Sequence, residues 1–290
     1  MNDFCILTDT YVGMTDEEIK KFDLKIVPMP IIIDEEVYYE NVNITREEFF
    51  EKIKTCNKLS TSQPSPEDVK KIWDELLLAY KKILYIPLSS GMSGTYNTVF
   101  TMSNMDEYKD KVLVVDAKRV SAPMQQSIEA AVRLRDSGVS ANDIKEKLEV
   151  NAPLQRVYLM IETFEYLKKG GRIMGIISMA GSLLKIKPIV VFDVGMTKLF
   201  KMTRSVKAAT KEMIDAINKE METAFKAYSD SKKIVITTAT AFKDEIAKTF
   251  EKEIEDAYPD IKVEHYLLPL VLCTHSGPGA LGACISVRVD

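Results

Sequence analysis

The stretch Ile83–Thr98 reads ILYIPLSSGMSGTYNT and decides how the first half of the chain folds. Four apolar residues, Ile83–Ile86, predict a buried strand, and Pro87 ends it. A turn rich in serine and glycine follows, and the segment then continues as a helix through Phe100. A strand, a helix and then another strand, Val112–Val115, indicate a right-handed crossover and therefore a parallel sheet.

The turn in this stretch has the composition of an anion-binding site. The first N–H groups of a helix lack partners within the helix, and the helix dipole favours negative charge beside them. Ser89, Ser90 and Ser93 add hydroxyl donors. Gly91 and Gly94 let the backbone approach a ligand closely. The turn would suit a carboxylate or a phosphate, although a plain helix cap explains the same residues.

Three well-defined motifs do not fit this turn. A dinucleotide-binding loop needs G-x-G-x-x-G, and a P-loop needs a lysine after its second glycine. A nucleophile elbow needs G-x-S-x-G, whereas the sequence GMSG at Gly91–Gly94 places the second glycine one residue early. The turn is therefore an anion cradle of no standard type.

The composition restricts the function of the chain. Its 290 residues suggest two domains, and a net charge of −4 without a basic stripe argues against a nucleic-acid partner. Four scattered cysteines and two histidines form no metal-binding motif, so we expect neither a metal nor a cofactor. The N-terminus opens directly into the strand-like DFCILTD, and no apolar run is long enough to cross a bilayer. We therefore expect a cytoplasmic protein without a signal peptide.

The first half of the chain is predicted to be an N-terminal α/β domain, residues 1–150, with a mainly parallel sheet flanked by helices. Its strands are expected at Phe4–Leu7, Ile83–Ile86 and Val112–Val115. Its helices are expected to begin at the capping residues Thr15, Thr45 and Ser65, and to cover Pro123–Arg135 and Asn142–Leu148. Strands separated by helices imply parallel pairing.

The second half, residues 151–290, is predicted to be a C-terminal α/β domain with a mixed or antiparallel sheet. Pro188–Asp193 and Thr197–Met202 read as the two strands of a hairpin. Helices are expected after Thr163 and along an amphipathic segment, Val206–Tyr228. Further strands are expected at Val157–Ile161, Ile234–Thr238, Lys262–Leu267 and Ala283–Val289.

Five polar turns are expected to meet in a cleft between the two domains. The carboxyl ends of strands and the interfaces between domains are the usual ligand sites of α/β proteins. The turns carry hydroxyls, glycines, one arginine and one histidine but few carboxylates: Thr8–Thr10, Thr61–Pro64, Ser89–Thr95, Lys169–Arg172 and Thr274–Gly279. This inventory indicates an anion site rather than a metal site or a pair of catalytic carboxylates.

The same turns, taken in order, resemble the motifs of the DegV family of bacterial fatty-acid-binding proteins. The matching segments are TDT at Thr8–Thr10, STSQPSP at Ser60–Pro66, LSSGMSGTYNT at Leu88–Thr98, YLKKGGRI at Tyr166–Ile173 and THSGPGALG at Thr274–Gly282. The resemblance covers essentially the whole chain. It implies a two-domain protein that holds one long-chain fatty acid, such as palmitate, stearate or oleate, in a buried tunnel. It also implies a separate ATP-dependent fatty acid kinase subunit, which receives the carboxylate and makes the acyl phosphate for phospholipid synthesis.

On this resemblance the protein is a carrier without catalytic residues of its own. The resemblance implies six ligand-binding residues, of which the first two hold the carboxylate: Thr61, Ser93, Ser62, Gly94, Arg172 and His275. Arg204 resembles a family position near the kinase-facing surface. No transmembrane segment is expected, and lipid exchange would require only transient contact with a membrane surface.

The acyl chain would need an apolar wall as well as a head-group site. The segment after Arg172 offers candidates that plain core packing would explain equally well: Ile173, Met174, Ile176, Ile177, Met179, Leu183 and Leu184. The sequence DAKRVSAP at Asp116–Pro123 departs from the Asp-Ser start and glycine-rich helix opening that are usual in the family. We expect this change to affect the shape of the tunnel and the choice of acyl chain, but not the capture of the carboxylate.

Two other classes of function remain open. Ser93 as nucleophile, His275 as base and Asp9 as orienting residue would make a serine hydrolase or acyl-transfer enzyme of unusual order. A binding protein for another small anion, such as a phosphorylated sugar or a nucleotide, would use the same turns.

Overall fold

The computed structural model describes residues 3–173, 186–194, 196–231 and 233–290. Within this part of the chain the strands form three sheets. The first is a parallel sheet in the order β2-β1-β6-β7, from β1 (Phe4–Asp9), β2 (Leu24–Val27), β6 (Lys82–Ile86) and β7 (Val112–Val114). The strands of this sheet are almost entirely buried, which is typical of a parallel sheet covered on both faces.

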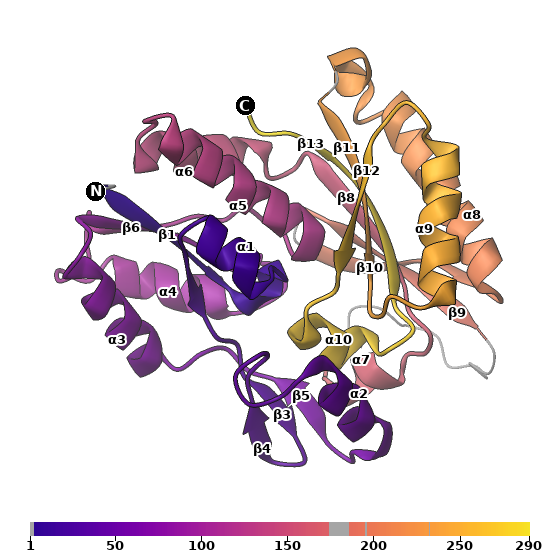
Figure 1. Cartoon of the computed structure of the whole chain (residues 1–290), viewed down its shortest axis with the longest axis horizontal. Coiled ribbons are helices and arrows are strands. Elements are labelled where there is room, and N and C mark those ends of the chain that lie inside the picture. The colour runs from indigo at the N-terminus through magenta and orange to yellow at the C-terminus, as the bar shows by residue number, and fades with distance from the viewer. Residues whose placement is uncertain (1–2, 174–185, 195, 232) are drawn as a thin grey trace.

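Six α-helices lie in the first half of the chain, and all but the second of them accompany the parallel sheet (Figure 1). They are α1 (Asp16–Lys21), α2 (Arg46–Thr55), α3 (Pro66–Leu77), α4 (Thr95–Ser103), α5 (Ser121–Asp136) and α6 (Ala141–Asn151). Thr15 and Thr45 each form the predicted capping box, and Ser65 caps α3 with Pro66 at its first position. A short 3-10 helix, η1 (Thr10–Val12), follows β1.

A small antiparallel sheet in the first half was not predicted. It has the order β4-β3-β5 and consists of β3 (Ile31–Ile33), β4 (Glu36–Tyr38) and β5 (Leu59–Thr61). Each strand has only three residues, which is too short for an alternating pattern to stand out in the sequence. The prediction that strands and helices simply alternate through the first half was therefore incomplete.

The second half contains a six-stranded mixed sheet in the order β10-β9-β8-β13-β11-β12. Its strands are β8 (Gln155–Met160), β9 (Lys187–Asp193), β10 (Met196–Thr203), β11 (Ile234–Thr240), β12 (Val263–Leu267) and β13 (Leu281–Val287). The predicted hairpin is present as the antiparallel pair β9–β10, while β11 and β12 pair in parallel. The two-domain α/β class, with one mainly parallel and one mixed sheet, is confirmed.

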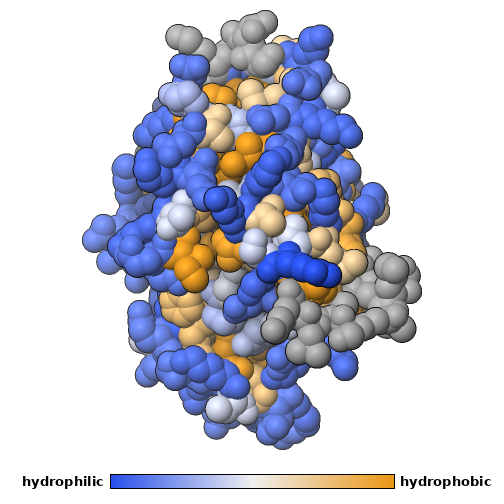
Figure 2. Space-filling model, turned by 90° about the vertical axis from the view of Figure 1, so that its right-hand side faces the viewer, coloured by the Kyte–Doolittle hydropathy of each residue, from blue (hydrophilic) through white to orange (hydrophobic). Residues whose placement is uncertain are grey.

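Two long helices cover the outer face of the mixed sheet. Figure 1 shows α8 (Val206–Glu222) and α9 (Glu245–Ala257) side by side on this face. Their outer surface is mostly hydrophilic, with apolar side chains showing between the charged ones (Figure 2). Helix α8 is shorter than predicted, because the chain leaves the helix after Glu222 and continues into η2 (Lys226–Ser231).

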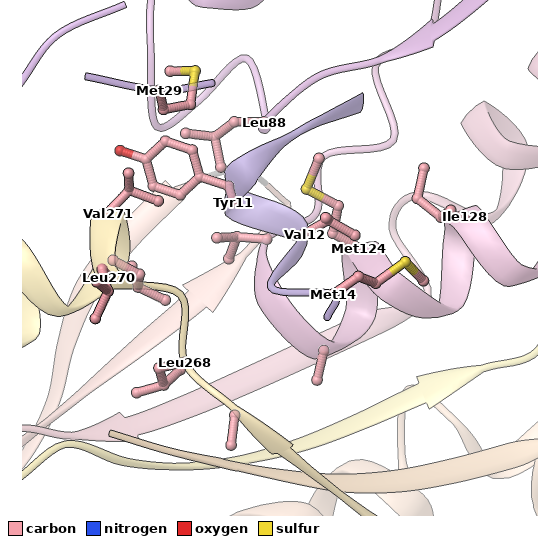
Figure 3. Close-up of a cluster of buried hydrophobic side chains, with 14 of the residues drawn as sticks. Tyr11, Val12, Met14, Met29, Leu88, Met124, Ile128, Leu268, Leu270 and Val271 are labelled. Atoms are coloured by element: carbon pink, nitrogen blue, oxygen red, sulfur yellow. The ribbon is translucent and has the colours of Figure 1, made fainter. Parts of the chain in front are cut away.

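The opposite face of the mixed sheet contributes to a core that both halves of the chain share. Helix α5 contacts β1 on one side and β11 and β13 on the other. Two shorter helices, α7 (Glu165–Lys169) and α10 (Leu270–Ser276), lie beside β5. Figure 3 shows Tyr11 of η1 packed among Met29, Leu88 and Val271, so residues from both halves enclose the region where the polar turns meet.

Candidate functional site

Three polar side chains from distant parts of the sequence form the centre of the candidate site. Oγ1 of Thr61, the last residue of β5, lies 2.9 Å from Nε2 of His275 in α10. The Tyr11 hydroxyl, from η1, donates to the same Thr61 oxygen over 3.5 Å. Thr61 and His275 are each only 8% exposed, so this cluster lies almost out of contact with water.

His275 is neutral near pH 7. Burial lowers its pKa to about 4, and the positive charge of Arg172 adds to this effect. If Tyr11 donates to Thr61 and Thr61 donates to Nε2, the single imidazole proton stays on Nδ1. Nδ1 is buried and has no hydrogen-bond partner among the described residues. The cluster therefore keeps one unused polar atom on the histidine.

Glycines at two positions allow His275 and its neighbours to pack this closely. A Cβ on Gly170 would lie 2.2 Å from Nδ1 of His275, and a Cβ on Gly277 would lie 2.4 Å from the Tyr166 ring. Gly277 also has a φ of +77°, in the region that favours glycine. The KGGR and HSGPG motifs are thus adjacent parts of one packed site.

Arg172 supplies positive charge at the rim of the site. It is exposed, and its guanidinium donates to the Gly170 carbonyl over 3.0 Å. Its positive charge helps to lower the pKa of His275. Burial raises the pKa of Tyr11 to about 12, and the charge of Arg172 partly offsets this rise. Arg172 is therefore placed to attract an anion to the cavity.

A cavity of about 220 Å³ opens beside these groups. Its polar lining includes Tyr11, Arg172, His275 and Ser276, and Gly91 and Met92 of the serine- and glycine-rich turn also border it. The remaining lining is mainly apolar and comes from both halves of the chain: Leu88, Leu159, Ile161, Leu167, Val190, Phe192 and Leu272. The hydroxyl of Ser276 is buried without a hydrogen-bond partner among the described residues. A cavity of this kind suits an amphipathic ligand with one polar end.

The serine- and glycine-rich turn is fixed by two carboxylates, the buried Asp9 and the half-buried Asp116. Asp9, at the end of β1, accepts the backbone N–H groups of Leu88 and Tyr11, and its burial raises its pKa to about 7. Asp116 accepts hydrogen bonds from the backbone N–H and the hydroxyl of Ser90. These contacts hold the turn against η1, which carries Tyr11.

The start of α4 follows this turn, and its N-cap residue is a glycine. Gly94 is the N-cap residue, with no side-chain hydrogen bond to the first turn. Ser93 is half-buried, its hydroxyl lies 2.9 Å from that of Thr95, and it accepts the Thr95 N–H over 3.2 Å. Gln63 links the two predicted carboxylate loops, since it accepts the Thr98 hydroxyl and lies beside Gly94.

The structure places the predicted ligand-binding residues unevenly. Thr61 and His275 are in direct contact, and Arg172 borders the same cavity. Ser62 is exposed and donates its hydroxyl to the Gln63 carbonyl. Ser62, Ser93 and Gly94 lie on the two linked loops next to the cavity, and Thr61 reaches it only through His275, so none of these four residues is in its lining.

Helix α10, which carries His275, is anchored by a pair of charged residues on the small-sheet side. Glu40 accepts the Leu270 N–H over 2.8 Å, and burial raises the pKa of Glu40 to about 7. Arg46 donates to the carbonyls of Ala241 and Leu268. The prediction had placed His275 in a glycine-rich turn, whereas it lies in the last turn of this seven-residue helix.

The remaining predicted residues are the docking residue Arg204 and the expected wall of the acyl-chain tunnel. Arg204 is exposed and directly follows β10. Ile173 packs against the shared core. The other expected wall residues, Met174, Ile176, Ile177, Met179, Leu183 and Leu184, fall in the part of the chain that the structure does not describe.

Tyr11 was not predicted, although it completes the polar cluster. Its only sequence signal is its place directly after the TDT turn at the end of the first strand. In the part of the chain that the structure describes, no three His, Cys, Asp or Glu side chains come together in a way that could hold a metal ion. Among the same residues no helix is both long and apolar enough to cross a membrane.

These features define a two-domain α/β protein with a partly polar cavity between its sheets. A family model described as "Uncharacterised protein, DegV family COG1307" matches residues 3–288. A DegV domain-containing protein of Clostridium acetobutylicum is 30% identical over 289 residues, which cover 96% of this chain and 95% of the relative. The chain belongs to the DegV family.

Solved structures of similar fold include two proteins described as binding fatty acids. DegV from Bacillus subtilis, described as a fatty acid binding protein, is 26% identical with a TM-score of 0.83, over 99% of this chain and 100% of that chain. A protein from Eubacterium ventriosum, described as a stearic acid-binding protein, has a TM-score of 0.86 at 22% identity, over 99% of both chains. At that identity the second structure shows the shared fold alone.

Proposed function

We propose that this protein binds one long-chain fatty acid, such as palmitate, stearate or oleate, and holds it for a partner enzyme. The single observation that carries the proposal is the placement of Arg172 and of His275, which contacts Thr61, at a cavity whose remaining lining is mainly apolar. The description of the B. subtilis protein as a fatty acid binding protein supports the choice of ligand.

The carboxylate would occupy the polar part of the cavity. The Thr61 hydroxyl, which now faces His275, would turn its hydrogen to the carboxylate, and Ser93 would offer a second hydroxyl from the neighbouring turn. Ser62 and Gly94 would supply donors from the two linked loops. Arg172 would balance the negative charge. Hydrogen bonds to a charged group contribute roughly 1.5–3 kcal/mol each, so a few such contacts suffice to fix the head group.

The acyl chain would extend along the apolar lining. Leu159, Val190 and Phe192 come from the mixed sheet, and Leu272 comes from α10. Residues 1–150 and 151–290 would then be the two domains, with the ligand between them. The strands of the first two sheets all lie between Phe4 and Val114, and those of the third lie between Gln155 and Val287, which supports this division.

The partner would be an ATP-dependent fatty acid kinase that converts the bound acid into an acyl phosphate for phospholipid synthesis in the cytoplasm. Arg204 would contribute to docking, because it is exposed and follows an edge strand, β10, that also exposes Phe200 and Met202. Thr197 near the start of β10 borders the cavity. Arg204 lies seven residues further on, roughly 20 Å along an extended strand.

The geometry favours a carrier over the serine hydrolase. A hydrolase of this order would pair Ser93 with His275. The Nε2 atom of His275 contacts Thr61 instead, and the hydroxyl of Ser93 contacts Thr95. The protein alone should therefore hydrolyse neither acyl esters nor ATP.

Calorimetric titration of delipidated protein tests the proposed ligand. Palmitate should bind with one site per chain. Hexadecanol should bind much more weakly because it lacks the charge, and butyrate should bind much more weakly because it lacks the chain. Equal affinity for palmitate and hexadecanol would contradict the carboxylate site, and no palmitate binding would reject the proposal as a whole.

A further inference from the structure

A second, smaller cavity adjoins the first along part of its apolar lining. It has a volume of about 20 Å³, room for one water-sized group. Leu159, Phe192 and Leu272 line both cavities, so the two are neighbours that share these walls. An acyl chain whose carboxylate lies at Thr61 and His275 would pass these three side chains before it reaches the small cavity.

The lining of the small cavity contains an unused hydroxyl. Ser121 is 5% exposed, borders this cavity, and its Oγ has no hydrogen-bond partner among the described residues. Ser121 also has a φ of +54°, which is uncommon for a residue other than glycine. A buried hydroxyl without a partner is costly, so its presence beside apolar walls requires an explanation.

Two further groups at the same place are polar. Thr237, on β11, is 1% exposed, and its Oγ1 has no oxygen or nitrogen partner among the described residues. Its polar neighbour is the Cys284 thiol, which is a weak hydrogen-bonding group. Ser121 is the first residue of the sixteen-residue helix α5, and no side chain caps this helix end. The Ser121 hydroxyl, the Thr237 hydroxyl and the uncapped start of α5 can therefore all form hydrogen bonds here. A plain hydrocarbon chain has no group that could accept or donate them.

We propose that Ser121 and Thr237 form a polar subsite that selects acyl chains carrying a hydroxyl or oxo group in their distal half. This inference rests on the proposed fatty-acid binding and names the class of fatty acid that the site prefers. A hydroxyl on the chain can donate to one of these oxygens and accept from the other, whereas a methylene leaves both unpaired. The segment Asp116–Pro123, which departs from the usual family sequence, supplies Ser121.

Competition binding to delipidated full-length protein tests the subsite. The probes are stearate and a set of hydroxystearates with the hydroxyl at successive positions of the distal half. At least one hydroxystearate should bind about tenfold more tightly than stearate, since one net neutral hydrogen bond is worth roughly that factor. Ser121→Ala and Thr237→Val should each remove most of this preference and leave the affinity for stearate unchanged. Ser137→Ala, at the far end of α5, is the matched control and should keep the preference.

Ser121→Gly provides a second variant, because glycine accepts the positive φ and lacks the hydroxyl. If no hydroxystearate binds more tightly than stearate, the small cavity holds at most a water molecule and the inference is wrong. A preference that survives in all three variants would also overturn it. If neither stearate nor any hydroxystearate binds, the proposed fatty-acid function fails as well, so the two failures are distinguishable.

Discussion

The Thr61 hydroxyl lies 2.9 Å from Nε2 of His275, although 214 positions separate the two residues in the sequence. One comes from the short antiparallel sheet of the first half, and the other from the last turn of α10 in the second half. Their contact joins the two halves of the chain beside the polar part of the cavity. The ligand-binding proposal depends on this pair.

Replacement of Thr61 by valine should weaken palmitate binding about tenfold or more, because it removes one hydrogen bond to a charged group while keeping the shape of the side chain. Calorimetry on delipidated protein measures the change. Thr98→Val is the matched control, since its hydroxyl donates to Gln63 on the neighbouring loop, whereas the Thr61 hydroxyl contacts His275, which borders the cavity. Equal effects of the two variants would place the carboxylate elsewhere.

Ser93→Ala tests the second predicted carboxylate ligand, after Thr61. Its hydroxyl already has a protein partner in Thr95, so the fold should be retained. Palmitate binding should nevertheless weaken by about tenfold, because Ser93 would donate to the carboxylate in the complex. Unchanged affinity in both Ser93→Ala and Thr61→Val would contradict the proposed head-group site.

Gly170→Ala should disrupt the site through sterics alone. The new Cβ would lie 2.2 Å from Nδ1 of His275, so the imidazole must leave its present position, in which it contacts Thr61. We expect a loss of stability of roughly 1–3 kcal/mol, typical of overpacking, together with weaker palmitate binding. Gly94→Ala is the control for the stability measurement alone, because its Cβ would meet only Gln63 Oε1 at an ordinary 3.6 Å. Urea unfolding curves that coincide for both variants would argue against the close packing of His275.

The pH dependence of stability should reveal the buried, neutral His275. Its pKa of about 4 in the folded protein lies below the ordinary value of 6.5, so between these values the unfolded chain binds the proton and the folded chain does not. Its contribution to stability is therefore fully retained above pH 6.5 and falls as the pH is lowered toward 4. His275→Gln should accordingly become less destabilising, by about 2 kcal/mol, when the pH falls from 7.5 to 5.

Urea unfolding of the wild type and the variant at the two pH values measures this difference directly. Because only the change between the variants is compared, the opposite contributions of Asp9 and Glu40, whose pKa values burial raises to about 7, cancel. A difference that does not vary with pH would mean that His275 is not held neutral by burial.

Arg204→Ala should slow formation of the acyl phosphate in the presence of the kinase and ATP, while fatty-acid binding stays intact. A charge at the edge of an interface chiefly affects encounter and docking. Lys71→Ala, exposed on α3 in the other half of the chain, is the control and should leave the rate unchanged. An equal loss of lipid binding in Arg204→Ala would place this residue in the pocket instead.

Much of the fold could be predicted from the sequence, because its elements carry strong local signals. The capping boxes at Thr15 and Thr45 and the apolar strand Ile83–Ile86 depend on residues close together in the chain. The three-residue strands of the small sheet have no such signal. Helix α10 was missed because it is short and lacks a side-chain cap at its start.

Residues of the site could be predicted only where they stand in a recognisable sequence motif. Thr61, Arg172 and His275 stand in recognisable segments, but the role of Tyr11 depends on a contact across 50 positions that no local pattern reveals. The unpaired hydroxyl of Ser121 likewise becomes visible only when β8, β9, β11 and α10 close the cavity around it.

Native mass spectrometry of the protein purified from a bacterial host, followed by organic extraction, tests the central claim most directly. We predict a mass above that of the bare chain by one long-chain fatty acid, and recovery of that acid in a ratio of one per chain. A bare chain with no extractable lipid, together with no binding of added palmitate or oleate, would contradict the account.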